Sequence, residues 1–160
     1  MKLLFLCTAN SCRSILSEAL FNHLAPAGLR AYSAGSQPRG EVHPLSLAAL
    51  RRAGIACEGL HSKACEAHAE LAPDLVITVC DKAAGESCPV FFGPAAKAHW
   101  GLCDPSELTG CTREIEAAFD SALTIIRTRV EAFLALPLQH LSRAQLQAEL
   151  ARIGTLGARP

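Results

Sequence analysis

The stretch LLFLCTANSCRS at residues 3–14 decides how this sequence is expected to fold. Its four leading apolar residues predict a buried strand, and the small and polar residues behind them predict a loop that enters a helix. A strand that passes through such a loop into a helix directs successive backbone N–H groups, and the positive end of the helix, at one point. The stretch therefore predicts an anion-binding loop at residues 7–14, which we name the Cys7 loop.

Cys7 is the expected nucleophile of this loop. The N–H dipoles of the loop and the guanidinium of Arg13 favour its thiolate, and a hydrogen bond from Ser14 is expected to lower the pKa of Cys7 further. Arg13 is expected to hold the anion through two parallel hydrogen bonds. A cysteine that closes a core strand is often only a small buried hydrophobe, but the strand before it and the helix behind it favour the anion-binding interpretation. The expected substrate-binding residues are Thr8, Ala9, Asn10, Ser11, Cys12, Arg13 and Ser14.

Composition limits the alternatives. The 160 residues suit one domain, and half of them are apolar, so a full core can be buried. Lys plus Arg and Asp plus Glu each number 15, so no net charge attracts nucleic acid or an anionic membrane. The apolar start is shorter than an export signal needs, and no later stretch has the roughly 18 apolar residues of a membrane span. We expect a soluble, cytoplasmic protein without nucleic-acid or membrane partners.

The eight cysteines are expected to be reduced thiols, because no export signal is present. None of them forms a Cys-x-x-Cys pair, so a structural zinc site is not expected. The spacing of Cys57, His61, Cys65 and His68 invites a metal assignment, but packing or solvent exposure is the favoured interpretation. We therefore expect no metal and no cofactor.

The rest of the chain alternates strands and helices, which predicts an α/β fold with a parallel sheet. Strands are expected at 29–34, 73–80 and 98–102, and helices at 14–24, 43–54, 115–133 and 142–154. Cys80 ends the second of these strands and Asp104 follows the third. Because parallel strands bring their carboxyl ends to one edge, both are expected beside Cys7. The polar segment 81–87 is expected to be a short helix or a mobile loop that lets Cys80 and Cys88 meet.

The Cys7 loop, with Ser-Glu-Ala at 17–19, resembles the loop of low-molecular-weight protein tyrosine phosphatases and of the arsenate reductases built on the same fold. Asp104-Pro105 matches the general-acid position of that family. The resemblance implies a single α/β domain with a four-stranded parallel sheet in the order 2-1-3-4, flanked by helices. It places a phosphatase-like arsenate reductase domain at 1–136 and a C-terminal helical extension of the same domain at 137–160.

The resemblance implies one first step for two activities: Cys7 attacks a tetrahedral oxyanion held by Arg13, and Asp104 protonates the leaving oxygen. In an arsenate reductase, Cys80 then attacks the Cys7 adduct and releases arsenite, and Cys88 resolves the Cys7–Cys80 disulfide. Thioredoxin, or a glutathione and glutaredoxin system, would reduce the final Cys80–Cys88 disulfide. In a phosphatase, water hydrolyses a phosphocysteine at Cys7 instead.

Arsenate reductase, acting in arsenic detoxification, is the favoured function. The segments Val79-Cys80-Asp81, Cys88-Pro89-Val90 and His99-Trp100-Gly101 resemble the redox segment of thioredoxin-coupled arsenate reductases. Ser106-Glu107 stands where tyrosine phosphatases of this fold carry aromatic residues. Phosphate and sulfate are expected to compete with arsenate, because all three are tetrahedral anions. A low-molecular-weight protein tyrosine phosphatase is the alternative, and a non-enzymatic oxyanion sensor is disfavoured because Arg13 and Asp104 are both present.

Two further interpretations are weaker. Cys12 or Cys103 could replace a resolving thiol, although both are more simply explained as small residues near the loop. By resemblance to some arsenate reductases, a potassium ion could lie among Asn10, Glu18 and Ser33, but a solvated Glu18 is the favoured interpretation.

Overall fold

The computed structural model describes residues 1–80 and 94–157. This part of the chain contains four strands, four α-helices and three short 3-10 helices. The strands are β1 (Lys2–Cys7), β2 (Arg30–Gly35), β3 (Leu75–Thr78) and β4 (Ala96–His99). The α-helices are α1 (Arg13–Leu24), α2 (Pro44–Arg52), α4 (Thr112–Leu134) and α5 (Arg143–Ile153). The 3-10 helices are η1 (Cys65–His68), η3 (Pro105–Glu107) and η4 (Leu138–His140).

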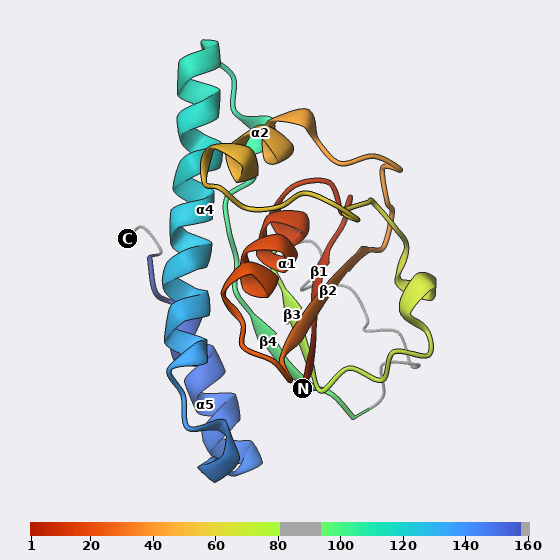
Figure 1. Cartoon of the computed structure of the whole chain (residues 1–160), viewed down its shortest axis with the longest axis vertical. Coiled ribbons are helices and arrows are strands. Elements are labelled where there is room, and N and C mark those ends of the chain that lie inside the picture. The colour runs from red at the N-terminus through yellow and green to blue at the C-terminus, as the bar shows by residue number, and fades with distance from the viewer. Residues whose placement is uncertain (81–93, 158–160) are drawn as a thin grey trace.

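The four strands form one parallel sheet in the order β2-β1-β3-β4. This order confirms the predicted sheet. In register, Cys7 lies opposite Gly35, and Thr78 lies opposite both Leu6 and His99, so the carboxyl ends of all four strands share one edge (Figure 1). The predicted strand at 98–102 was misplaced, because β4 begins at Ala96 and ends at His99. The chain beyond β4 still runs along the end of β3, since the Leu102 N–H donates to the Val79 carbonyl at 3.1 Å.

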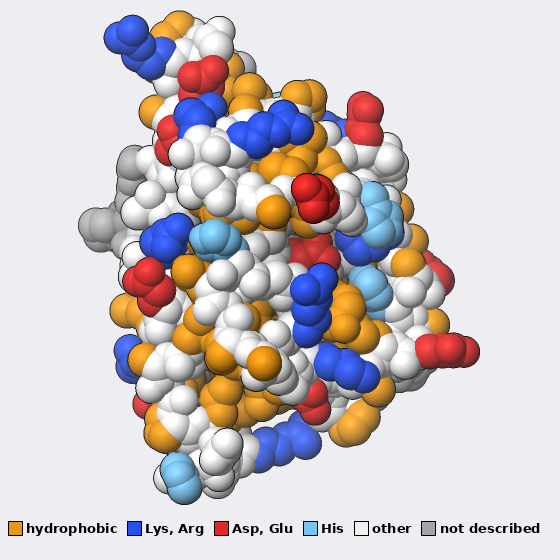
Figure 2. Space-filling model, viewed as in Figure 1, with side chains coloured by type: hydrophobic (Ala, Val, Ile, Leu, Met, Phe, Trp, Pro, Cys, Tyr) orange, Lys and Arg blue, Asp and Glu red, His pale blue; other side chains and the backbone are white. Residues whose placement is uncertain are grey.

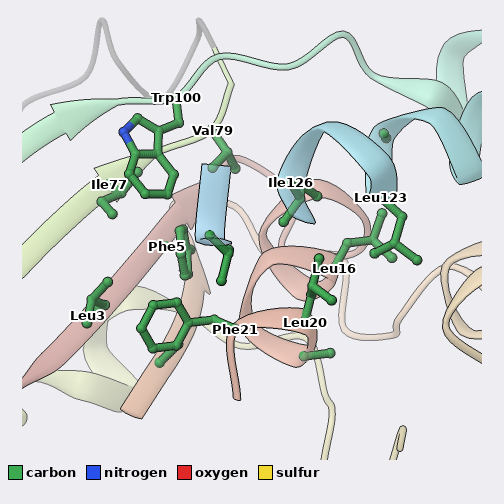
Figure 3. Packing of buried hydrophobic residues seen from close by; sticks show 14 of the residues in the cluster. Leu3, Phe5, Leu16, Leu20, Phe21, Ile77, Val79, Trp100, Leu123 and Ile126 are labelled. Carbon is green, nitrogen blue, oxygen red and sulfur yellow. The ribbon is translucent and has the colours of Figure 1, made fainter. Parts of the chain in front are cut away.

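The main core lies on one face of the sheet, where alternate strand residues meet the helices. Phe5 contacts Phe21 of α1 and also Trp100, with ring centroids 6.2 and 6.1 Å apart (Figure 3). All four described α-helices contribute buried apolar residues to this cluster. A smaller cluster around Leu4 and Val76 covers the other face. Trp100 is 3 % exposed, which confirms its predicted place in the core.

The C-terminal helix α5 turns back beside α4, as Figure 1 shows. Its predicted capping box is confirmed: the Ser142 hydroxyl accepts from the Gln145 N–H, and the Gln145 side chain accepts from the Ser142 N–H. The indole N–H of Trp100 donates to the Leu150 carbonyl at 2.9 Å. This bond ties α5 to the segment that follows β4.

On the face seen in Figure 2, basic and acidic side chains are interspersed, and no large patch of one charge sign is seen. This agrees with the equal numbers of basic and acidic residues. Among the helices at 1–80 and 94–157, none is both long and apolar enough to cross a membrane.

Candidate active site

The Cys7 loop joins the end of β1 to the start of α1, and its backbone is held from the outside. The carbonyls of Thr8, Ala9 and Ser11 accept hydrogen bonds of 2.9 Å from the N–H groups of Gln37, Arg39 and His43. Within the described part of the chain, the N–H groups of residues 9–14 donate to no protein acceptor. Carbonyls that face outward and a run of N–H donors without partners are the features of an anion-binding loop.

Asn10 fixes the shape of this loop. Its backbone adopts a left-handed conformation with φ of 46°, which asparagine tolerates better than most residues. Its amide nitrogen donates to Ser14 Oγ at 2.8 Å and to Ser33 Oγ at 3.0 Å. Its amide oxygen accepts from the Lys63 N–H at 2.9 Å. The fully buried side chain therefore joins the loop to α1, to β2 and to the segment around Lys63.

Gly35, at the end of β2, allows the loop to approach the sheet. A Cβ at this position would lie 2.5 Å from the Thr8 carbonyl oxygen and 3.0 Å from Asn10 Cβ. We expect Gly35→Ala to displace the loop, to cost about 1–3 kcal/mol of stability and to weaken phosphate binding. Denaturant unfolding and phosphate titration would measure both effects. Gly28→Ala is the control, since it meets nothing within 4 Å and should lower stability without changing phosphate affinity. Wild-type phosphate binding by Gly35→Ala would contradict this view.

A buried ionic cluster lies behind the loop, and its cation is Lys63. The Lys63 ammonium lies 3.3 Å from Ser33 Oγ, 3.5 Å from Asn10 Oδ1 and 3.9 Å from Glu18 Oε2. Burial raises the pKa of Glu18 and lowers that of Lys63, while the opposite charge of each partner acts against these shifts. The interpretation of Glu18 as a solvated side chain was wrong. Among Asn10, Glu18 and Ser33, the residues considered for a potassium ion, lies the positively charged ammonium of Lys63.

Arg13 and Asp104 meet at the mouth of the loop. The guanidinium donates to the Leu102 carbonyl at 3.0 Å and pairs with Asp104 Oδ2 at 3.2 Å. The other carboxylate oxygen, Oδ1, accepts from the Ser106 N–H at 3.0 Å and from its hydroxyl at 2.6 Å. Arg13 Nε is buried and has no hydrogen-bond partner among residues 1–80 and 94–157. An unpaired buried donor is costly, and an oxyanion in the loop would satisfy it with a charge-assisted hydrogen bond.

Cys7 and Cys80 are in contact, as expected from their places at the ends of β1 and β3. Both are buried, their thiols are hydrogen bonded to each other, and the Cys80 sulfur lies 3.5 Å from Thr8 Oγ1. The hydrogen bond with Cys80 and burial raise the pKa of Cys7, against the opposing effects of Arg13 and the Thr8 N–H. The expectation of a lowered pKa for Cys7 was therefore wrong. Its sulfur faces a second thiol, while the Ser14 hydroxyl is engaged with Asn10.

Replacing Cys80 is expected to make Cys7 titrate at lower pH. In Cys80→Ala the neighbouring thiol no longer raises the pKa of Cys7, whereas Arg13 and the Thr8 N–H still favour the thiolate. Because the thiolate is the nucleophile, the rate of Cys7 alkylation by iodoacetamide should rise at lower pH than in wild type. Mass spectrometry of the Cys7 peptide across a pH series would measure this. An unchanged or higher inflection in Cys80→Ala would contradict the assignment.

Cys12, Cys103 and Cys88 are the other cysteines that the sequence analysis considered for the reaction. Cys12 lies in the loop, where burial raises its pKa to about 12, so it is a protonated thiol at neutral pH. Cys103 is exposed beside Asp104. At residues 1–80 and 94–157, no group of three or more His, Cys, Asp or Glu side chains could hold a metal ion. Cys88 lies outside the described residues, and so does the segment that joins it to Cys80.

Lys63 and Ser106 contribute to the site but were not predicted. Lys63 lies in the stretch 55–71, which has no apolar period from which its burial could be inferred. Ser106 had a recognisable signal, because Asp104 followed by Pro105 is a typical helix start. Asp104 does cap η3 through the Ser106 N–H.

Known proteins are similar to this chain in sequence and in fold. A sequence model of the family described as low molecular weight phosphotyrosine protein phosphatase matches residues 2–151. The chain belongs to this family. Its relatives within the family include the arsenate reductase of Bacillus licheniformis, which is 34 % identical over 129 residues, covering 81 % of this chain and 91 % of the relative.

Solved structures of this fold agree with that membership. One, described as an arsenate reductase in the phosphate binding state, superposes with a TM-score of 0.69 and 27 % identity, covering 84 % of this chain and 96 % of the other. A thioredoxin-dependent arsenate reductase of Corynebacterium glutamicum has a TM-score of 0.58 and 28 % identity, covering 81 % of this chain and 61 % of that one. The family thus includes enzymes that reduce arsenate.

Proposed function

We propose that this member of the low-molecular-weight phosphatase family is a cytoplasmic arsenate reductase that acts in arsenic detoxification. The observation that carries the proposal is the position of the Cys80 thiol beside Cys7, where it lies 3.5 Å from Thr8 Oγ1 and acts on the pKa of Cys7. A phosphatase needs only the thiol that attacks phosphorus. A reductase needs a second thiol beside the first, because two electrons must leave the protein. The arsenate reductases among its relatives support the same choice.

The first step uses the Cys7 loop as an oxyanion site. The loop N–H groups and Arg13 Nε bind arsenate. Because the pKa of Cys7 is raised, its thiol passes its proton to the bound arsenate as the sulfur attacks arsenic and forms a sulfur–arsenic bond. One arsenate oxygen leaves as water after it receives a proton from Asp104. Asp104 suits this role because Arg13 and Ser106 hold its two oxygens beside the loop. Arsenic remains in its +5 state at this stage.

The second step transfers the electrons. The Cys80 thiolate attacks Cys7 Sγ, so a sulfur–sulfur bond forms as the sulfur–arsenic bond breaks. The electron pair of the broken bond stays on arsenic, which leaves as arsenite in the +3 state. Two thiols are oxidised to one disulfide, and this balances the two electrons gained by arsenic. The contact between Cys7 and Cys80 supports this step, since the attacking sulfur needs little movement.

The third step restores Cys7. Cys88 attacks Cys80 in the Cys7–Cys80 disulfide, releases the Cys7 thiolate and leaves a Cys80–Cys88 disulfide. Thioredoxin, or a glutaredoxin with glutathione, then reduces this disulfide by the same exchange chemistry. The thioredoxin-dependent relative from Corynebacterium glutamicum favours thioredoxin.

A coupled assay tests the proposed function. Purified protein is incubated with arsenate, thioredoxin, thioredoxin reductase and NADPH, and a parallel reaction contains glutaredoxin, glutathione and glutathione reductase. We expect arsenate-dependent NADPH oxidation in at least one reaction, with competition by phosphate and sulfate. Vigorous hydrolysis of an aryl phosphate without NADPH oxidation would instead assign a phosphatase. Stoichiometric binding without any turnover would assign a sensor.

A further inference from the structure

Arg129 is a buried arginine on α4 whose function the proposed chemistry does not explain. It is 2 % exposed and is the largest of the fully buried side chains. No carboxylate in the described part of the chain forms an ion pair with it. Its Nε and Nη1 atoms donate to three backbone carbonyls instead. A charge buried against carbonyls alone is costly, so a position like this one is expected to serve a purpose other than stability.

The three carbonyls lie in two segments that the helix thereby joins. Nη1 donates to the Trp100 carbonyl at 2.9 Å and to the Gly101 carbonyl at 3.1 Å. Nε donates to the Leu156 carbonyl at 2.9 Å, in the turn that follows α5. Arg129 thus links the chain beyond β4 to the chain beyond α5.

The next carbonyl along the chain belongs to the other arginine. Leu102 accepts from Arg13 Nη1 at 3.0 Å, and two residues later Asp104 pairs with Arg13 Nη2. The carbonyls of residues 100, 101 and 102 are therefore taken in succession, the first two by Arg129 and the third by Arg13. The segment at 100–104 lies between a guanidinium from the core helix and a guanidinium from the active site.

Side-chain packing holds the start of this segment, where the Trp100 ring lies 6.4 Å from the Phe133 ring of α4, but it leaves a space beside residues 101–105. A pocket of about 560 Å³ lies there, lined by Gly101, Asp104 and Pro105 on one side and by Ala118 and Ala122 of α4 on the other. Small side chains on the helix leave this space unfilled. Hydrogen bonds hold this segment from two sides: the N–H groups of Trp100 and Leu102 donate to the carbonyls of Thr78 and Val79, and Arg129 supplies two more bonds from α4.

We propose that Arg129 is a positioning residue for the active site. It fixes the backbone at 100–101, which in turn places the Leu102 carbonyl that orients Arg13 and the Asp104 carboxylate beside the loop. Arg129 contacts neither anion nor nucleophile and acts through these two residues. The effect of Arg129 on proton transfer by Asp104 rests on the proposed function. The effect of Arg129 on Arg13 depends only on anion binding.

Phosphate binding to the reduced protein tests the inference. Arg129→Met keeps much of the side-chain volume but removes every donor, and Arg129→Lys keeps the charge but loses the fork. Val130→Ala, one residue along α4 and fully buried, is the matched control that lowers stability while it leaves the Arg129 hydrogen bonds to residues 100 and 101 in place. Inorganic phosphate is titrated calorimetrically into each protein, and thermal unfolding is recorded beside it.

We expect Arg129→Met to raise the Kd for phosphate about tenfold, Arg129→Lys to raise it about threefold, and Val130→Ala to leave it within twofold of wild type. A phosphate Kd within twofold of wild type in Arg129→Met would overturn the inference. Equal weakening by Val130→Ala would do the same, because the effect would then follow stability alone. Should Arg129→Met fail to fold, Arg129→Lys decides by the same twofold limit.

These outcomes are separate from the fate of the proposed function. A wild-type protein that binds phosphate but does not reduce arsenate would refute the reductase proposal, while the phosphate affinities would still decide the role of Arg129. If arsenate is reduced, kcat adds a second readout. Poor placement of Asp104 should lower kcat in Arg129→Met even at saturating arsenate, whereas a purely structural role predicts an unchanged kcat for the folded fraction.

Discussion

Arg13→Lys is expected to lower kcat/KM for arsenate by about 10²-fold or more, which is the usual effect of removing one donor from an oxyanion site. In the wild-type protein the guanidinium divides its donors between two tasks. Nη1 and Nη2 are held by the Leu102 carbonyl and by Asp104, and Nε remains for the anion. A lysine ammonium keeps the charge, but it cannot reach both anchors and the anion at once.

Initial rates over a range of arsenate concentrations would measure this loss, together with the phosphate inhibition constant. Arg127→Lys is the matched control, because Arg127 forms an exposed pair with Glu131 at 3.7 Å. It should behave as wild type. Wild-type arsenate kinetics in Arg13→Lys would show that Arg13 does not bind the anion.

Cys80→Ser and Cys88→Ser are expected to stop the reaction at different steps. Cys80→Ser should form the Cys7 adduct but release no arsenite, because a hydroxyl then replaces the thiol that is proposed to attack Cys7. Cys88→Ser should release one equivalent of arsenite and then remain as a Cys7–Cys80 disulfide, since Cys80 attacks without the help of Cys88. Steady-state arsenate reduction should be lost in both variants.

Peptide mass spectrometry after one pulse of arsenate would distinguish the two trapped species. Cys111→Ser is the matched control, because Cys111 is exposed and precedes α4, away from the Cys7 loop. Wild-type turnover by both variants would refute the relay. Exposed Cys103 would then be the next thiol to test, ahead of buried Cys12, whose pKa is raised to about 12.

Local sequence patterns predicted most of the fold. The apolar run at 3–6, the capping box at Ser142 and the 3.6-residue period behind α4 each describe a structure that short-range contacts determine. The sheet order came from the family resemblance, because no pattern within one strand specifies its neighbours. The misplaced fourth strand has a simple cause: Trp100 and Leu102 are apolar like strand residues, but they lie beyond the last ladder pair of β4.

The sequence predicted which residues form the site, but it did not predict the direction of the Cys7 pKa shift. Cys7, Arg13, Cys80 and Asp104 were expected at one edge, and the structure brings these four together. The direction of the Cys7 pKa shift was not predictable, because it depends on which neighbour the sulfur faces. Sequence spacing suggested Ser14 as that neighbour, whereas the tertiary fold places Cys80 there.

Arg129 is a charged residue within the apolar periodic pattern of α4, and its partners were not predicted from the sequence. It lies between Ile126 and Phe133 on the apolar face of α4, where a charged residue is out of place. That mismatch is a usable signal, because a charge inside a core stripe needs partners that the fold must supply. Its partners are backbone carbonyls far along the chain, and a sequence gives no indication of which ones.

A single turnover without any external reductant tests the central claim most directly. Fully reduced protein is mixed with excess arsenate, and the arsenite released is counted beside the free thiols that remain. We predict one arsenite per protein chain and the loss of two thiols, with none of either in Cys7→Ser. No arsenite from the wild-type protein, with all of its thiols retained, would contradict the proposal that this chain reduces arsenate.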